Sequence, residues 1–191
     1  MSRVALYDAV AADYDRFVNW EGRLSYELPF FESLFEARGV HSVLKAKEAT
    51  YIPEWAGFSM GLRSLLAFHK PDLVIVTLGG NEVAMLDPSI RSEPVRKIVE
   101  TIGERPCVWV GAPLWGPHTG ILEVIRSNCS PCHFVDTNRI VPDLERLKDG
   151  VHPTLPERKR WAKAMVEWLA RHRDPNGRRP WDLKPDAQGG P

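Results

Sequence analysis

Residues 71–82 read PDLVIVTLGGNE and decide the fold class of this 191-residue chain. The run Leu73–Leu78 is short, rich in β-branched residues and followed by two glycines, which is typical of a strand buried on both faces of a parallel sheet. The same design recurs at Cys107–Val110 and, more weakly, at His133–Val135. The segment His41–Ala46 is a fourth predicted strand.

Helical patterns alternate with these strands. Apolar residues recur at helical spacing in four segments: Ser59–His69, Ile90–Ile102, Gly120–Ser127 and Leu155–Arg171. This alternation predicts an α/β fold, a three-layer sandwich in which a flavodoxin-like parallel sheet is covered by helices on both faces. Because ligands bind beyond the carboxyl ends of the strands in such sheets, a site is expected after Leu78, Val110 and Val135.

The pattern divides the chain into three parts. Residues 1–44 contain two helical patterns, so a helical arm is expected there in place of the first strand of the sheet. Residues 45–172 carry the α/β pattern. Residues 173–191 are rich in proline, glycine and charge and lack periodicity, which predicts a disordered tail.

Composition argues against several classes of protein. The 25 basic and 25 acidic residues give a formal net charge of zero, which argues against a nucleic-acid partner. No apolar run approaches the roughly 20 residues of a membrane span, and the start, MSRVALYDAV, lacks the apolar stretch of a signal peptide. Three cysteines are too few for a disulfide framework. A cytoplasmic protein is expected, and composition leaves its oligomeric state open.

The glycine-rich end of the first quoted stretch is a candidate oxyanion site. Gly79 and Gly80 let the backbone approach a ligand, and Asn81 places a side-chain amide at the carboxyl end of the strand. An amide donor held there stabilises a developing oxyanion. The alternative is an ordinary turn, since glycine and asparagine are common turn formers.

The segment KDGVHPT (148–154) is the second candidate. Asp149 and His152 are three residues apart in a loop that contains Gly150 and Pro153. An aspartate in such a loop can accept the Nδ1 proton of the imidazole while Nε2 faces a nucleophile, which is the base-and-orienter half of a hydrolytic triad. The alternative is a loop histidine followed by a residue that caps the last helix.

Together these segments resemble the SGNH (GDSL-type) hydrolase family over about Lys45–His172. KPDLVIVTLGGNE is similar to its third conserved block, RPCVWVGAPLW to the strand between blocks, and DGVHPT to its fifth block, Asp-x-x-His. The resemblance implies an α/β esterase or lipase that acts on a small-molecule ester or acyl substrate. It makes Asn81 an oxyanion donor, His152 the general base and Asp149 its orienter.

Two of the family's blocks depart from its pattern. No Gly-Asp-Ser is present, and by position the nucleophile's place falls on Arg23 in EGRLS, with Ser25 two residues further on as the nearest candidate nucleophile. The glycine of the second block has no counterpart in KEATYIPEW (47–55), where the backbone N–H of Ala49 or Thr50 could donate instead.

The N-terminal part has a second resemblance. Residues 7–44 are similar to the start of class I S-adenosylmethionine-dependent methyltransferases, but KAKEATY follows Val43-Leu44 in place of a Gly-x-Gly loop, so the cofactor site is absent. The expected arrangement is a chimera, in which this arm replaces the first strand and nucleophile of an SGNH domain. The alternatives are an inactive binding module on an SGNH scaffold and, third, a methyltransferase fragment.

Three other features concern possible ligands. Cys129 and Cys132 form a C-x-x-C pair without a second pair or zinc-spaced histidines, so neither a metal nor a cofactor is predicted. Trp115 follows a strand end in PLWGPH and is expected beside a substrate pocket. His118 in the same loop is either a second polar wall of that pocket or a solvated side chain.

Overall fold

The computed structural model describes residue 36 and residues 39–47 and 49–185. The chain divides into two compact units, Met1–Glu48 and Ala49–Pro191, and the sheet and candidate site lie in the second unit. The helices predicted before residue 36 lie outside the described residues.

One predicted strand does not form. Residues 40–47 have no regular secondary structure, so the strand prediction at His41–Ala46 is wrong. Val43 and Leu44 are 45% and 44% exposed. In a strand, two neighbouring side chains point to opposite faces, so each face of this segment would carry only one of these apolar side chains. That is too little apolar surface to hold the segment against a sheet.

The three remaining predicted strands form one parallel sheet. These strands are β1 (Val74–Val76), β2 (Cys107–Gly111) and β3 (His133–Asp136), in the order β1-β2-β3. Val76 pairs with Trp109, and Gly111 pairs with Asp136. Every residue of β2 is buried, as expected for a central parallel strand covered on both faces.

The four predicted helices are also present, with shifted ends. They are α4 (Leu62–His69), α5 (Ser92–Ile102), α6 (Ile121–Asn128) and α8 (Leu155–His172). Short elements that periodicity did not predict are α3 (Ile52–Ala56), α7 (Thr137–Ile140) and the 3-10 turns η1 (Gly80–Glu82) and η2 (Pro88–Arg91). With one parallel sheet and these helices, the second unit is an α/β fold.

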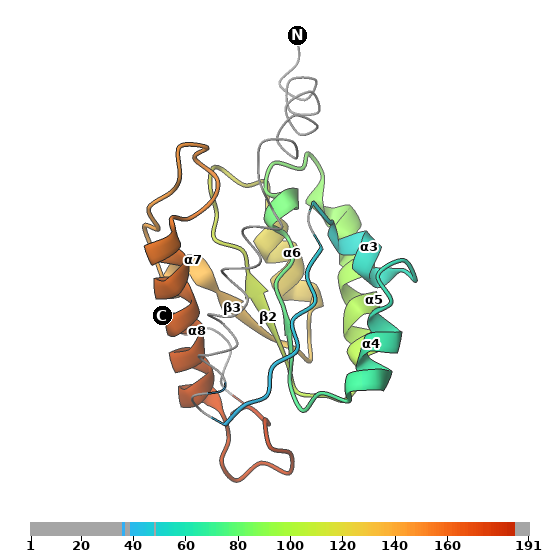
Figure 1. Cartoon of the computed structure of the whole chain (residues 1–191). Coiled ribbons are helices and arrows are strands. Elements are labelled where there is room, and N and C mark those ends of the chain that lie inside the picture. The colour runs from blue at the N-terminus through green and yellow to red at the C-terminus, as the bar shows by residue number, and fades with distance from the viewer. Residues whose placement is uncertain (1–35, 37–38, 48, 186–191) are drawn as a thin grey trace. The chain divides into compact units, whose positions relative to one another are not determined.

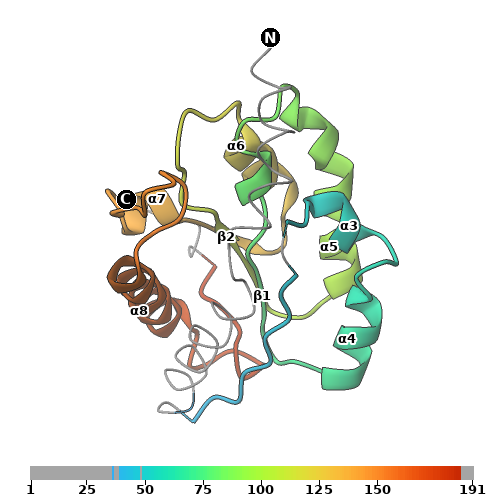
Figure 2. The same ribbon diagram turned by 45° about the horizontal axis from the view of Figure 1, so that its top comes forward.

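Helices lie on both sides of the strands in the second unit. Figures 1 and 2 show α3, α4 and α5 on one side and α7 and α8 on the other. The helices α5 and α6, which follow β1 and β2 in the chain, contact each other. None of the helices in the described part is long and apolar enough to cross a membrane.

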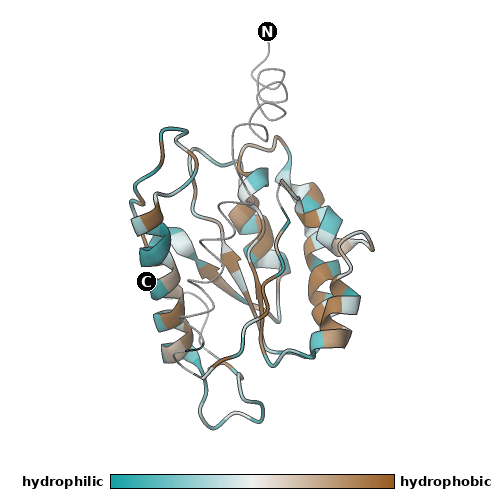
Figure 3. Cartoon of the chain, in the orientation of Figure 1, coloured by the Kyte–Doolittle hydropathy of each residue, from teal (hydrophilic) through white to brown (hydrophobic). Residues whose placement is uncertain are grey.

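The core lies between the sheet and these helices. Figure 3 shows the strands as apolar, in contrast to the mixed surface of the helices. Trp109 in β2 is fully buried. The buried helix residues are Val95, Ile98, Val99 and Ile102 of α5, Ile121, Leu122 and Ile125 of α6, and Ala162, Val166, Trp168 and Leu169 of α8. A fully buried aliphatic side chain contributes roughly 1.5–3 kcal/mol, so these faces hold the helices to the sheet.

A disulfide joins the first residue of β2 to the residue before β3. Cys107 and Cys132 are bonded, with Cα atoms 4.7 Å apart, whereas Cys129 is a buried free thiol. Burial raises the pKa of Cys129 to about 11, so this thiol stays protonated at neutral pH. The two cysteines of the C-x-x-C pair are therefore not bonded to each other. The count of three cysteines did not predict the Cys107–Cys132 disulfide.

The segment after α8 has local structure that the prediction of a disordered tail did not anticipate. Asp174 N–H donates to the carbonyl of Asp182, and Lys184 N–H donates to His172 at the end of α8. Arg179 Nη2 lies 3.2 Å from Glu104 Oε2. Hydrogen-bonded turns therefore shape this segment up to residue 185, and residues 186–191 lie outside the described residues.

Candidate active site

The glycine-rich segment after β1 forms a tight turn. Glu82 N–H donates to the Gly79 carbonyl at 3.2 Å, which closes η1. Gly79 has φ +112°, and a Cβ there would lie 2.7 Å from Ile125 Cδ1 of α6. Both backbone conformation and space therefore require glycine at this position. The turn that was the alternative prediction is therefore present. This turn holds Asn81 at the carboxyl end of β1.

Asn81 joins this turn to the segment before α3. Its Nδ2 donates to the Thr50 carbonyl at 2.9 Å. Ala49, the preceding residue, has φ +49°, in the left-handed region that non-glycine residues rarely adopt. The structure thus brings together Asn81 and the Ala49–Thr50 backbone, which the family resemblance assigned to one oxyanion site. An amide nitrogen carries two hydrogens, so Asn81 keeps a second donor beyond this bond.

Asp149 and His152 form a hydrogen-bonded pair in the loop before α8. His152 Nδ1 lies 3.0 Å from Asp149 Oδ2. The other carboxylate oxygen, Oδ1, accepts from Val151 N at 2.8 Å and His152 N at 2.9 Å. Gly150 allows this with φ +69°. Both side chains stay partly accessible, at 22% for His152 and 26% for Asp149.

The electrostatics keep Asp149 ionised. Burial alone would raise its pKa, but the N–H groups of His152 and Val151 and the His152 ring more than offset burial and lower the pKa to about 2. An ionised carboxylate accepts the Nδ1 proton, so the neutral ring carries its lone pair on Nε2. This is the tautomer that a general base needs.

Arg146 connects the 149–152 loop to the loop after β2. Its guanidinium donates to the carbonyls of Val151 and Leu114. Beside Leu114, Trp115 Nε1 donates to the Gly80 carbonyl at 3.3 Å. The two candidate segments are therefore linked through residues 113–115, although they lie about 70 residues apart in sequence.

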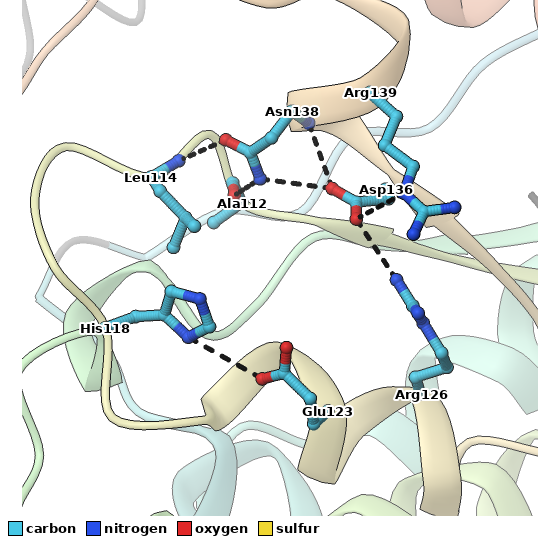
Figure 4. Close-up of polar contacts among 8 residues, drawn as sticks. All are labelled: Ala112, Leu114, His118, Glu123, Arg126, Asp136, Asn138 and Arg139. Carbon is cyan, nitrogen blue, oxygen red and sulfur yellow. Dashed lines mark hydrogen bonds and ion pairs between the residues drawn. The ribbon is translucent and has the colours of Figure 1, made fainter. Parts of the chain in front are cut away.

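The loop after β2 is also held from β3. Figure 4 shows Asn138, at the start of α7, accepting from Leu114 N at 2.8 Å and donating to Ala112 O at 3.4 Å and Asp136 Oδ1 at 3.2 Å. The other oxygen of Asp136 lies 3.1 Å from Arg126 Nη2. Asn138 is thus a positioning residue for the loop that carries Trp115.

His118 lies on the same loop but contacts a different element. Its Nδ1 is 3.6 Å from Glu123 Oε2 (Figure 4) and 3.2 Å from Gly120 N, both at the start of α6. These contacts make His118 a partner of α6, and the prediction of a second pocket wall stays open.

The cap alternative for the 149–152 loop also has an outcome. Thr154 is the N-cap residue of α8, but its hydroxyl makes no capping bond.

Sequence reasoning missed Arg146, Asn138 and Glu82. Asn138 carries the signal used for Asn81, a polar residue directly after a buried strand, and could have been found. Arg146 has no such signal, because the Pro113 and Leu114 carbonyls that it bonds lie 33 and 32 residues away in sequence. Ser25 lies outside the described residues, so the structure does not test it.

Two open hollows of the described part lie away from the candidate site. Two adjoining cavities, of about 340 and 480 Å³, share a lining of Glu104, Arg105, Pro106 and Arg179 near the amino end of β2. Asp149, His152 and Asn81 line neither of them. The candidate site is therefore defined by hydrogen-bond geometry at the opposite, carboxyl end of the sheet, where the family resemblance and the fold both predict it.

Comparisons with protein-family models, with curated proteins and with solved structures found no match to this chain.

Proposed function

We propose that this chain is a hydrolase of the SGNH type, acting on an ester bond of a small-molecule substrate. The observation that carries the proposal is the Asp149–His152 pair, with Nδ1 and Oδ2 3.0 Å apart, linked through Arg146 and Trp115 to the turn that holds Asn81. A base with its orienter and an amide donor beyond one sheet edge supply the proton transfer and the oxyanion stabilisation that acyl transfer requires beside its nucleophile.

The proposed mechanism has two steps. A serine hydroxyl attacks the ester carbonyl carbon while its proton passes to His152 Nε2, and the carbonyl oxygen becomes an oxyanion stabilised by Asn81 Nδ2 and the Ala49 N–H. Collapse breaks the ester bond, and His152 returns its proton to the departing alcohol. Water then attacks the acyl-serine by the same route, releasing the acid and restoring the serine.

Several predictions from the sequence are part of this proposal. For the fold, they are a three-layer, flavodoxin-like sandwich with a helical arm in place of the first strand and divisions of the chain at residues 44 and 172. For ligands, they are no cofactor, no metal and no nucleic-acid partner. The cytoplasmic location also stays a prediction. The Cys107–Cys132 disulfide weighs against it, because such bonds are typical of oxidising compartments.

An inactive SGNH-type binding module is the second candidate. The observation in its favour is the sequence itself, which contains no Gly-Asp-Ser and has Arg23 at the position that corresponds to the nucleophile. A methyltransferase fragment is the third reading, and the missing Gly-x-Gly loop after Leu44 argues against it.

A serine-directed fluorophosphonate distinguishes the first two candidates. We expect the full chain to turn over p-nitrophenyl acetate and to gain one adduct, located on Ser25 by peptide mass spectrometry and absent from Ser25→Ala. An adduct on another serine would reject Ser25 alone. A chain with neither turnover nor adduct would overturn the hydrolase proposal and favour the binding module.

A further inference from the structure

Glu82, the residue after Asn81, is a buried carboxyl group that the proposed mechanism leaves unused. It is 1% exposed, at the end of η1. Its Oε1 accepts from the Ile52 N–H at 2.7 Å, at the first residue of α3. A carboxyl buried this fully is rare in proteins unless it has a specific partner or a role.

Asn81 and Glu82 hold the same short segment from the same turn. Asn81 Nδ2 bonds the Thr50 carbonyl, and Glu82 Oε1 bonds the Ile52 N–H, so residues on either side of Tyr51 are fixed to η1. Ala49 begins this segment in a left-handed conformation, with φ +49°. A non-glycine residue persists there only where its surroundings determine it, and these two bonds provide that constraint.

The site of Glu82 is poorly suited to a purely structural carboxylate. Arg91 Nε lies 3.5 Å from Oε1, while Oε2 is buried without a hydrogen-bond partner among the described residues. Burial raises the pKa of Glu82, and the Ile52 N–H and Arg91 oppose that shift. An apolar side chain at this position would avoid the free-energy cost of burying a carboxyl group. The property that distinguishes Glu82 from such a side chain is its oxygen acceptor for the Ile52 N–H.

We propose that Glu82 is a positioning residue for the oxyanion site, acting through the Ile52 N–H to set the orientation of the Ala49 and Thr50 N–H groups. This inference rests on the proposed hydrolase function. Loss of an oxyanion donor lowers kcat by about 10²–10³-fold in a protease. A donor that is misoriented but present is expected to cost less, about 10–100-fold in kcat, with KM little changed.

Two variants at this position separate the hydrogen bond from the burial. Glu82→Gln keeps a carbonyl acceptor of the same shape for the Ile52 N–H, and its kcat on p-nitrophenyl acetate is expected within about threefold of wild type. Glu82→Met keeps the length but removes the oxygen acceptor, and its kcat is expected to fall about 10–100-fold. Ile102→Val, in the fully buried core face of α5, is the control for general loss of stability and is expected to keep the wild-type kcat.

The outcomes distinguish this inference from the proposed function. Turnover that depends on His152 but is unchanged in Glu82→Met overturns the positioning role alone, as does an equal loss in Glu82→Gln and Glu82→Met. Absence of His152-dependent turnover in the wild type overturns both. If Glu82→Met does not fold, amide hydrogen exchange in the wild type tests the hydrogen bond from the Ile52 N–H to Glu82 Oε1 instead. An Ile52 amide that exchanges as fast as the amide of Lys148, an exposed residue, would contradict that bond and with it the positioning role.

Discussion

At the residue scale, the carboxyl group of Asp149 has two separate functions in its loop. Oδ1 accepts two backbone N–H groups and fixes the loop, whereas Oδ2 accepts from the ring of His152. Because the two oxygens have different partners, one substitution can separate loop folding from orientation of the base.

Asp149→Asn is that substitution. An asparagine oxygen can still accept the two N–H groups, but its amide nitrogen cannot accept the Nδ1 proton, so the ring is left with the wrong tautomer. We expect kcat to fall about 10³–10⁴-fold, as in a serine protease with the same change. Steady-state hydrolysis of p-nitrophenyl acetate checks this, and a variant within threefold of wild type would contradict the pairing.

The same residue predicts a dependence of stability on pH. The pKa of Asp149 is lowered from 3.8 to about 2, so its contribution to the free energy of unfolding is present above about pH 4 and disappears as the pH falls towards 2. The contribution is about 1 kcal/mol, because water screens a side chain that is partly exposed. Urea unfolding of the wild type and Asp149→Asn should therefore differ at pH 6 and converge near pH 2.

Gly79 gives a prediction about backbone strain. Gly79→Ala is expected to cost about 1–3 kcal/mol of unfolding free energy, because φ is +112° and the new Cβ would meet Ile125 Cδ1 at 2.7 Å. Gly150→Ala is the matched control, with φ +69° and no atom within 4 Å of its Cβ. Equal midpoints for the two variants in urea would show that contact with α6 is unimportant.

At the scale of elements, three loops at the carboxyl end of the sheet are joined by side chains rather than by helices. Arg146 spans from the 149–152 loop to Leu114, and Trp115 spans onward to Gly80. The position of the base relative to Asn81 therefore depends on a few long polar side chains.

Arg146→Lys tests this connection. A single ammonium cannot span from the Val151 carbonyl to those of Pro113 and Leu114, all of which the planar guanidinium bonds, so the 149–152 loop should lose its fixed position relative to Leu114. We expect kcat to fall about tenfold with KM nearly unchanged. Arg171→Lys is the control, because the Arg171 side chain bonds the Glu167 carbonyl at 3.3 Å, within α8 and away from the candidate site. A drop of similar size in both variants would argue against the connection.

Elements were more predictable from sequence than their contacts. Leu73–Leu78 is a continuous apolar run and Val95–Ile102 has a helical apolar period, so the strands and long helices could be predicted from the pattern of apolar residues. The helices α3 and α7 are too short for a helical period to be visible. The strand prediction at His41–Ala46 was wrong because two neighbouring apolar residues, Val43 and Leu44, resemble the short apolar run of a buried strand. The Asp149–His152 pair was predictable because it is local, whereas the Arg146 and Glu82 bonds join segments about 30 residues apart.

At the scale of the whole molecule, the second unit has two chemically different ends. The carboxyl end of its sheet gathers Asn81, Asp149 and His152, and the amino end carries the Cys107–Cys132 disulfide beside the 480 Å³ cavity. The proposed chemistry belongs to the first end. Because the proposed chemistry does not involve the cavity, we expect substitutions such as Arg105→Ala at the amino end to leave ester hydrolysis unchanged.

The most direct test of the account is the rate of p-nitrophenyl acetate hydrolysis by His152→Ala, measured beside wild type and His118→Ala. His118 is a partly exposed histidine on a neighbouring loop, held by Glu123 rather than by an orienting loop aspartate. We predict that kcat/KM falls at least about 10³-fold in His152→Ala and by less than threefold in His118→Ala. Equal rates for the wild type and His152→Ala would contradict the hydrolase proposal.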